Sequence, residues 1–364
     1  MSVTVDNVLQ ALSRVLDPDL KKDLVSLGMI RDIEVSDLKV SFSVVLTTPA
    51  CPLKESIKSS CIQAIHDWVH PDAEVQVNLS ARVTTVNRSD GSSLKTVKNI
   101  IAVASGKGGV GKTTVAANIA LSLAKSGART ALVDADIYGP SLPLMFGLVN
   151  EPIRAIQVNG QTKAIPLRKH GIDLLSIGFF VDASKALIWR GPLASSALKQ
   201  LFFDTQWGEI DYMIVDLPPG TGDIHLSLVQ SVPLTGAVIV TTPHELAIAD
   251  ATKAVNMFNN ENIHVPILGV VENMSWFTPA ELPSNRYYIF GDGGGVKMAN
   301  DLKLTLLGQL PLIAPNNQSG IYVDNDMLSA SQQLQPYFDS IVANLVRQVS
   351  ISNAQKQELK TALP

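Results

Sequence analysis

Residues 99–114 read NIIAVASGKGGVGKTT, and this stretch decides the fold of the larger part of the chain. The segment from Gly106 to Thr114 matches the pattern G-x-x-x-x-G-K-[ST], which holds phosphate groups. The apolar run before it, Ile100–Ala104, predicts a buried strand, and the alanine-rich run after it predicts a helix that ends at Gly127. A strand, a glycine-rich turn and a helix in this order are the context that the motif requires.

The residues of this loop have separate chemical roles. Glycines let the backbone curl around a phosphate without Cβ clashes, and successive N–H groups at the helix N-terminus attract the anion. Lys112 is expected to reach the β- and γ-phosphates, and the Thr113 hydroxyl is expected to ligate Mg²⁺. The predicted phosphate-binding residues are Gly106, Lys107, Gly108, Gly109, Val110, Gly111, Lys112, Thr113 and Thr114.

Carboxylates follow two other apolar runs. Asp134 and Asp136 end the run that begins at Thr130, and Asp216 ends the run that begins at Tyr212. The carboxyl ends of parallel strands are where such sheets bind ligands. We expect Asp216 to act on Mg²⁺ through water, and residues 218–220, Pro-Pro-Gly, to form a switch that senses the γ-phosphate.

From residue 99 onward, short β-branched runs alternate with helical stretches. The runs predict strands buried on both faces of a parallel sheet that is wrapped by helices. They lie at residues 100–104, 130–133, 212–215, 237–240 and 267–271. The predicted fold class is α/β, with a parallel-sheet P-loop NTPase domain preceded by a small α+β domain.

Changes in pattern along the chain predict the domain boundaries. Residues 1–85 read as the small domain, because residues 39–44 and 74–79 alternate polar and apolar around an amphipathic helix. Residues 86–98 are polar and turn-rich and read as a linker. The NTPase domain is expected at residues 99–350, closing with a helix at 330–349, and residues 351–364 are expected to form a loose tail.

The composition excludes several classes of protein. The 364 residues carry 29 basic and 33 acidic side chains, so the net charge of −4 disfavours a general nucleic-acid binder. No apolar run is long enough to span a membrane, and the N-terminus lacks an export signal. Two cysteines cannot form a disulfide framework. We therefore expect a cytoplasmic protein without membrane or nucleic-acid partners.

A second lysine in the loop, Lys107, resembles the deviant-Walker ATPases, the class that includes MinD, ParA, the nitrogenase iron protein and the Mrp/ApbC proteins. In that class this lysine crosses a dimer interface to the nucleotide of the partner subunit. The resemblance therefore implies a homodimer. It also implies that Asp136 orients or activates the attacking water and that Asp134 supports the magnesium shell. An asparagine at Asn273 and a proline at Pro311 would lie against the adenine.

Four further motifs are similar to the Mrp/ApbC subfamily, the ATP-dependent iron–sulfur cluster carriers, over roughly residues 3–350. They are Asp-Ala-Asp-Ile-Tyr-Gly-Pro-Ser (134–141), Trp-Arg-Gly-Pro (189–192), Asp-Leu-Pro-Pro-Gly-Thr-Gly-Asp (216–223) and Glu-Asn-Met-Ser (272–275). The first domain, with Thr-Thr-Pro-Ala-Cys-Pro at 47–52, is similar to the small domain that precedes the ATPase in many bacterial members. The resemblance implies a slow Mg-dependent ATPase that passes clusters to apoproteins and works with assembly factors.

One departure from that subfamily concerns the cluster ligands. Its carriers usually hold a Cys-x-x-Cys shortly after the Asn-Met-Ser segment, but residues 274–288 contain no cysteine. Cys61 lies on the apolar face of the helix expected in the small domain and is expected to be a core residue. Cys51, just before Pro52, is expected to be a helix N-cap with a lowered thiol pKa, and so a possible soft-metal or cluster ligand.

Three functions remain open on the sequence. The leading hypothesis is a homodimeric Mg-ATPase that binds and transfers iron–sulfur clusters. The first alternative is a nucleotide-gated assembly scaffold without its own cluster, which the missing Cys-x-x-Cys favours. The second is a MinD- or ParA-like positioning ATPase, for which residues 350–364 offer no basic amphipathic helix.

Overall fold

The structure of this chain is a computed structural model, and it describes residues 3–85, 94–180, 191–261, 263–279, 281–282, 284–313 and 326–362. Two compact units make up the chain. One unit combines the N-terminal residues up to Val86 with the C-terminal residues from Val346 onward. The other unit spans Asn87–Leu345.

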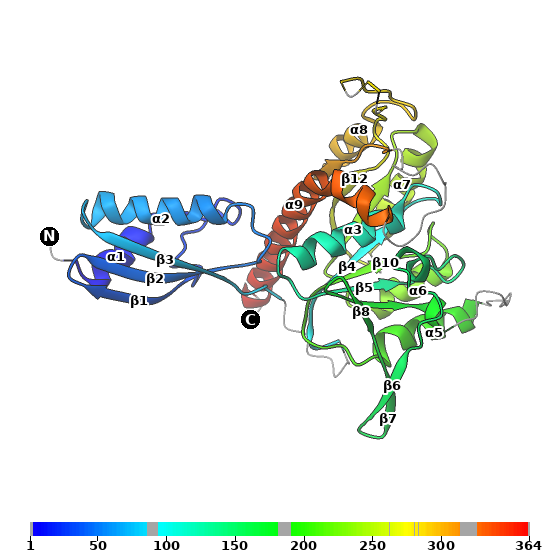
Figure 1. Cartoon of the computed structure of the whole chain (residues 1–364), viewed down its shortest axis with the longest axis horizontal. Helices are drawn as coiled ribbons and strands as arrows, with labels where there is room; N and C mark the ends of the chain where they lie inside the picture. Colours follow the sequence, from blue (N-terminus) through cyan, green and yellow to red (C-terminus); the bar gives the residue numbers. More distant parts are fainter. Residues whose placement is uncertain are drawn as a thin grey trace. The chain divides into compact units, whose positions relative to one another are not determined.

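An eight-stranded sheet forms the centre of the larger unit (Figure 1). All neighbouring strands are parallel except β8, which runs antiparallel to β9. The five strands that the β-branched runs predict are confirmed, and β10 is buried along its whole length. In spatial order the strands are β13 (Leu306–Gln309), β12 (Ile267–Glu272), β11 (Gly236–Thr241), β4 (Val97–Ala104), β10 (Ile210–Asp216), β5 (Thr130–Asp134), β9 (Ile172–Ser176) and β8 (Leu167–Lys169).

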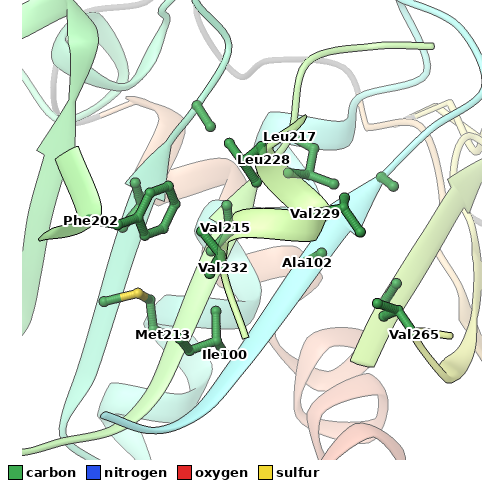
Figure 2. Packing of buried hydrophobic residues seen from close by; sticks show 14 of the residues in the cluster. Ile100, Ala102, Phe202, Met213, Val215, Leu217, Leu228, Val229, Val232 and Val265 are labelled. Atoms are coloured by element: carbon green, nitrogen blue, oxygen red, sulfur yellow. The ribbon is translucent and has the colours of Figure 1, made fainter. Parts of the chain in front are cut away.

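Helices cover this sheet, as the alternating pattern predicts. Helix α3 packs on the central strands, α7 on β11 and α8 on β12. Figure 2 shows how Leu228 and Val229 of α6, and Val232 just after its end, lie in the core beside the side chains of β4 and β10. The helices are α3 (Lys112–Lys125), α4 (Leu142–Met145), α5 (Gly191–Phe203), α6 (Asp223–Ser231), α7 (Glu245–Phe258) and α8 (Gly294–Asp301). A short 3-10 helix, η1 (Ile177–Phe179), and a hairpin of β6 (Arg154–Val158) and β7 (Gln161–Ile165) complete the unit.

The smaller unit is an α+β arrangement, as expected. Its three-stranded sheet has the order β1 (Ile30–Ser36), β2 (Lys39–Leu46) and β3 (Glu74–Ala81), with an antiparallel and then a parallel pair. Helices α1 (Val5–Leu12) and α2 (Lys54–Trp68) pack against each other and close its hydrophobic core. Every second residue of β2 is buried, which is the one-sided burial that its alternating sequence predicts.

The C-terminal helix is longer than its sequence suggests. The prediction of a helix at 330–349 is confirmed within α9 (Asp326–Ala362), but the prediction of a loose tail from residue 351 is wrong for residues 351–362. These residues are helical and belong to the smaller unit, where the Asn353 side chain is buried and donates to the Thr84 carbonyl at 3.1 Å. Among the described residues, no helix is both long and apolar enough to cross a membrane.

Candidate nucleotide-binding site

The glycine-rich loop joins β4 to α3, as its sequence predicts. Two of its glycines are required by the geometry. A Cβ at Gly106 would lie 2.0 Å from the carbonyl carbon of Asp250 in α7, so no larger residue fits there. Gly111 has φ +81°, which L-residues rarely adopt, and a Cβ there would lie 2.3 Å from the side-chain amide nitrogen of Asn273. The loop is therefore fixed between α7 and the end of β12.

Lys112, Thr113 and Asp216 meet at the end of the central strands. The Lys112 ammonium lies 2.5 Å from one carboxylate oxygen of Asp216, and the Thr113 hydroxyl donates to the other at 2.6 Å. The side chain of Asp216 is fully buried and that of Lys112 nearly so. Burial raises the pKa of Asp216, while the ammonium and the two hydrogen bonds oppose that rise. The structure thus brings together three residues that the sequence assigns to one site.

Asp134 is a neighbour of Asp216 across the β5–β10 pair. It is fully buried, and it accepts hydrogen bonds from the Ser176 hydroxyl at 3.0 Å and from the backbone N–H groups of Asp136 at 3.0 Å and Leu142 at 3.3 Å. Burial, together with the nearby charge of Asp216, raises the pKa of Asp134 to about 7. The buried carboxylate of Asp134 therefore holds the loop that follows β5 in place. Its hydrogen-bond partner Ser176 is not predicted by the sequence pattern.

Asp136 lies in that loop and is only partly buried. One of its carboxylate oxygens accepts from the backbone N–H groups of Tyr138 and Gly139, each at 3.3 Å. These two bonds fold the loop back on the aspartate. The carboxylate keeps a position beside the strand ends from which it can contact solvent.

The segment after β10 is tied directly to the phosphate-binding loop. The backbone N–H of Gly220 donates to the Ser105 carbonyl at 3.0 Å, and the Ser105 hydroxyl donates to the Lys107 carbonyl at 2.9 Å. Gly220 has φ +89°, a conformation that favours glycine. A movement of residues 218–220 would therefore displace Ser105 and Lys107. The side chain of Lys107 is partly exposed.

The residues expected near the adenine lie at the ends of β12 and β13. The Asn273 side chain donates to the Val110 carbonyl at 2.9 Å, so its amide braces the phosphate-binding loop. Pro311 is buried two residues after β13. Glu272, the residue before Asn273, is fully buried. Its carboxylate accepts hydrogen bonds from the backbone N–H of Gly295 at 2.5 Å and from the side-chain amide of Gln309 at 2.7 Å. Sequence reasoning missed Glu272, although a carboxylate at a strand end was a usable signal.

Cys51 does not have the environment that the sequence predicts. Helix α2 begins at Lys54 with Leu53 as its N-cap, so the predictions that Cys51 caps the helix and that its thiol pKa is lowered are both wrong. Burial raises the pKa of the Cys51 thiol, and the nearby Asp17 and Asp19 raise it further, beyond what the Leu53 N–H offsets. Cys51 lies half-buried in a small pocket within the smaller unit.

Cys61 is a core residue, as expected. It is fully buried among the apolar side chains of the smaller unit, and burial raises the pKa of its thiol to about 12. Among the described residues, no group of three or more histidine, cysteine, aspartate or glutamate side chains could hold a metal ion.

The segment that follows Asn273 is organised by aromatic packing. Trp276 is buried, the Arg286 guanidinium lies 4.4 Å from the centre of its ring, and Tyr337 meets it edge-on at 6.0 Å. The backbone of Phe277 forms isolated β-bridges with Tyr287 and Leu312. Trp189 and Arg190, of the predicted Trp-Arg-Gly-Pro motif, lie outside the described residues, as does most of the predicted linker, residues 86–93.

Comparisons with known proteins agree with this geometry. Residues 96–349 match the model of the NUBPL iron-transfer P-loop NTPase family, and residues 5–78 match that of the iron-sulfur cluster assembly protein family. The chain is 48% identical to the iron-sulfur cluster carrier protein of Synechocystis sp., over 85% of this chain and 87% of that protein. It is 43% identical to the protein of that name in Deinococcus radiodurans, over 98% and 96% of the two chains.

Among solved structures, the chain is similar to the nucleotide-binding protein of Archaeoglobus fulgidus in complex with ADP. The TM-score is 0.53 at 33% identity, covering 69% of this chain and 90% of the other. The predicted fold class, a P-loop NTPase domain preceded by a small α+β domain, is confirmed by this neighbour and by the eight-stranded and three-stranded sheets of the structure.

Proposed function

Because the chain belongs to the NUBPL iron-transfer P-loop NTPase family, we propose that it is a Mg-dependent ATPase that carries iron–sulfur clusters to apoproteins. The observation that carries the ATPase half is the meeting of Lys112, Thr113 and Asp216 within 2.6 Å at the end of a parallel sheet. An ammonium group, a hydroxyl and a carboxylate in this arrangement are the groups that bind a nucleoside triphosphate with its metal.

The donor set beside the loop fits Mg²⁺. The Thr113 hydroxyl and the Asp216 carboxylate are hard oxygen donors only 2.6 Å apart, and Mg²⁺ prefers oxygen ligands. When bound, the ion would neutralise negative charge on the phosphates. Thr113 would ligate the ion directly, Asp216 would hold it through water, and Asp134, next to Asp216, would support this magnesium shell.

The chain's own residues would perform the remaining steps. The backbone N–H groups of the loop bind the phosphates, and Lys112 moves from Asp216 to the β- and γ-phosphates. Asp136 orients the attacking water from the partly exposed loop after β5. Lys107 of one protomer reaches the phosphates of its partner in a homodimer, where its charge offsets that developing during phosphoryl transfer. Asn273 and Pro311 form the adenine side.

The cargo is assigned from the relatives. Two of them are named iron-sulfur cluster carrier proteins, and they are 48% and 43% identical to this chain. Carriers deliver clusters to apoproteins, so the partners we propose are apo iron–sulfur proteins and assembly factors, in the cytoplasm. Cys51 is the more exposed of the two thiols, and a dimer would supply two such thiols. Since a [4Fe–4S] cluster usually has four thiolate ligands, other ligands would complete the set.

Two observations favour the alternative of a nucleotide-gated scaffold without its own cluster. The sequence lacks cysteine at residues 274–288, and the pKa of the Cys51 thiol is raised, which disfavours the thiolate that binds iron. In this alternative the ATP state would control the recruitment of assembly partners.

Steady-state ATP hydrolysis tests the ATPase proposal. Lys112→Ala and Asp136→Ala should each abolish Mg-dependent turnover, because one removes the phosphate-binding charge and the other the group that orients water. Lys125→Ala is the matched control, since Lys125 is an exposed lysine at the other end of α3. Normal turnover in Lys112→Ala or Asp136→Ala would refute the assignment.

Anaerobic reconstitution with iron and sulfide separates the carrier from the scaffold. The carrier should become brown, with iron and acid-labile sulfide that Cys51→Ser loses and Cys61→Ser retains. A colourless wild-type protein would support the scaffold. The positioning ATPase is tested by co-sedimentation with vesicles or DNA in the presence of ATP, for which we expect no binding.

A further inference from the structure

A fully buried carboxylate lies at the end of β12, one residue before Asn273. Both of its oxygens accept hydrogen bonds, one from the backbone N–H of Gly295 at 2.5 Å and the other from the side-chain amide of Gln309 at 2.7 Å. Within the described part of the chain, no cationic side chain forms an ion pair with Glu272. A buried charge without a counter-ion is less stable than an apolar side chain of similar volume. The stability of the fold therefore does not explain this residue.

Three elements meet at this carboxylate. Gly295 is the second residue of α8, so Glu272 caps the N-terminus of that helix, whose positive end favours an anion. A Cβ at Gly295 would lie 2.9 Å from the carboxylate oxygen that the N–H contacts, so the close approach depends on glycine. Gln309 is the last residue of β13, and it lies opposite Glu272 in the parallel pair of β12 and β13. The side chain of Glu272 therefore ties β12 to both β13 and α8.

The turn that follows Glu272 has an unusual backbone conformation. Met274 has φ +55°, which is uncommon for a residue other than glycine. Such conformations persist only where the surrounding structure holds them. Here the Asn273 N–H donates to the Thr241 carbonyl at 2.8 Å, and the Ser275 hydroxyl donates to the Glu272 carbonyl at 3.0 Å. Both ends of the turn are therefore anchored, and Glu272 is the anchor at its start.

This turn carries the side chain that contacts the phosphate-binding loop. The Asn273 amide donates to the Val110 carbonyl at 2.9 Å. Its nitrogen would lie only 2.3 Å from a Cβ at Gly111, so the turn and the loop are in close contact. A displacement of the turn would break the bond to Val110 and release one side of the loop.

We propose that Glu272 is a positioning residue of the nucleotide site. By tying α8 and Gln309 to the end of β12, it fixes the turn at Asn273, and through Asn273 it fixes the phosphate-binding loop. Its contribution to nucleotide affinity comes through Asn273, since its own carboxylate is fully buried and engaged. This inference rests on the proposed nucleotide binding.

A double-mutant cycle tests whether Glu272 acts through Asn273, with the Kd for Mg-ADP measured by titration calorimetry. Glu272→Gln keeps the size of the side chain but replaces one acceptor by a donor, and it should raise the Kd about five-fold, the factor for a net hydrogen bond of about 1 kcal/mol. Asn273→Ala should raise the Kd by a similar factor, because it removes the bond to Val110. The double variant should also stay near about five-fold, because both changes break the same link. Independent effects would multiply to about 25-fold.

An exchange of the two side chains provides a rescue. In Glu272→Gln combined with Gln309→Glu, the amide now on β12 can accept from the Gly295 N–H and donate to the carboxylate now on β13. The Kd should return to within about two-fold of the wild type. Gln309→Leu breaks the link from a less buried position, in case Glu272→Gln does not fold, and should raise the Kd about five-fold.

Val270→Ala is the matched control, because it removes buried apolar volume from the same strand without changing a polar atom. It should lower the unfolding temperature and leave the Kd within about two-fold of the wild type. The inference is overturned if Glu272→Gln and Gln309→Leu bind Mg-ADP as the wild type does, if the double variant shows the multiplied effect, or if the exchange restores nothing. A wild type that takes up no Mg-ADP instead overturns the proposed nucleotide site, and this inference with it.

Discussion

The first glycine of the phosphate-binding loop gives the sharpest structural prediction. In Gly106→Ala, the new methyl group would lie 2.0 Å from the carbonyl carbon of Asp250, 2.2 Å from its oxygen and 2.5 Å from the backbone nitrogen of Ala251. Real Cβ atoms do not approach other atoms so closely. The neighbours are backbone atoms inside α7, so no side chain can rotate away, and either the loop or the helix must move.

The size of the effect follows from the cost of overpacking, which is typically about 1–3 kcal/mol. The larger unit spans residues 87–345, and in a domain of this size each 1 kcal/mol lowers the unfolding temperature by about 2–4 °C. We therefore expect Gly106→Ala to lower the unfolding temperature of that unit by roughly 2–12 °C. Gly108→Ala is the matched control, because a Cβ at Gly108 meets nothing within 4 Å.

Scanning calorimetry without nucleotide is the appropriate assay, since a chain with two compact units need not unfold in one step. Only the transition of the larger unit should shift in Gly106→Ala, and Gly108→Ala should stay within about 2 °C of the wild type. Nucleotide binding should be lost in Gly106→Ala, because the loop is displaced from α7. Equal shifts in the two variants would show that the close approach to Asp250 does not determine the loop.

Three other predictions concern charge and packing. Because the folded-state pKa of Asp134 is raised to about 7 from 3.8, the folded state binds more protons than the unfolded state between about pH 4 and 7. The ionisation of Asp134 therefore lowers the free energy of unfolding as the pH rises through this range. In urea unfolding, Asp134→Asn should show a smaller loss of stability over the same range. Lys107→Ala should lower ATP turnover at least ten-fold and leave the unfolding temperature unchanged, since its side chain is partly exposed. Asn353→Ala should weaken hydrogen-exchange protection around Thr84 and in residues 346–362, because it removes the 3.1 Å bond to the Thr84 carbonyl; unchanged protection would contradict the packing of this segment.

The sequence predicted the parts of the site that backbone geometry dictates. A glycine-rich turn between an apolar strand and a helix has few possible conformations, so the position of Lys112 and Thr113 followed from local pattern alone. Asp216 and Asp134 followed from sheet topology, because parallel strands end at the same edge. The meeting of Asp216 with Lys112 required only that β10 lie beside β4, the strand that leads into the loop, and Asp134 lies next to Asp216 because β5 is the other neighbour of β10.

Residues whose environment comes from distant parts of the chain were not predictable in this way. Burial raises the pKa of Cys51, and Asp19 and Asp17 raise it further; neither the burial nor these two aspartates can be read from the local sequence around the cysteine. The start of α2 at Lys54 removes the helix N-terminus that the preceding Pro52 suggested. The tail from residue 351 is polar in sequence, but Asn353 finds its partner at Thr84, more than 250 positions away in the chain.

The buried ion pair between Lys112 and Asp216 predicts how nucleotide binding and metal binding depend on each other. A phosphate that takes Lys112 away leaves the fully buried Asp216 without its cation, and uncompensated buried charges are strongly unfavourable. A divalent cation beside Asp216 would remove that penalty, so ATP should bind at least ten-fold more weakly in EDTA than with Mg²⁺. Asp216→Asn carries no charge to compensate, so its ATP affinity should depend far less on Mg²⁺. Titration calorimetry of both proteins, with and without Mg²⁺, measures the two ratios, and equal ratios would refute the idea that Asp216 couples the two ligands.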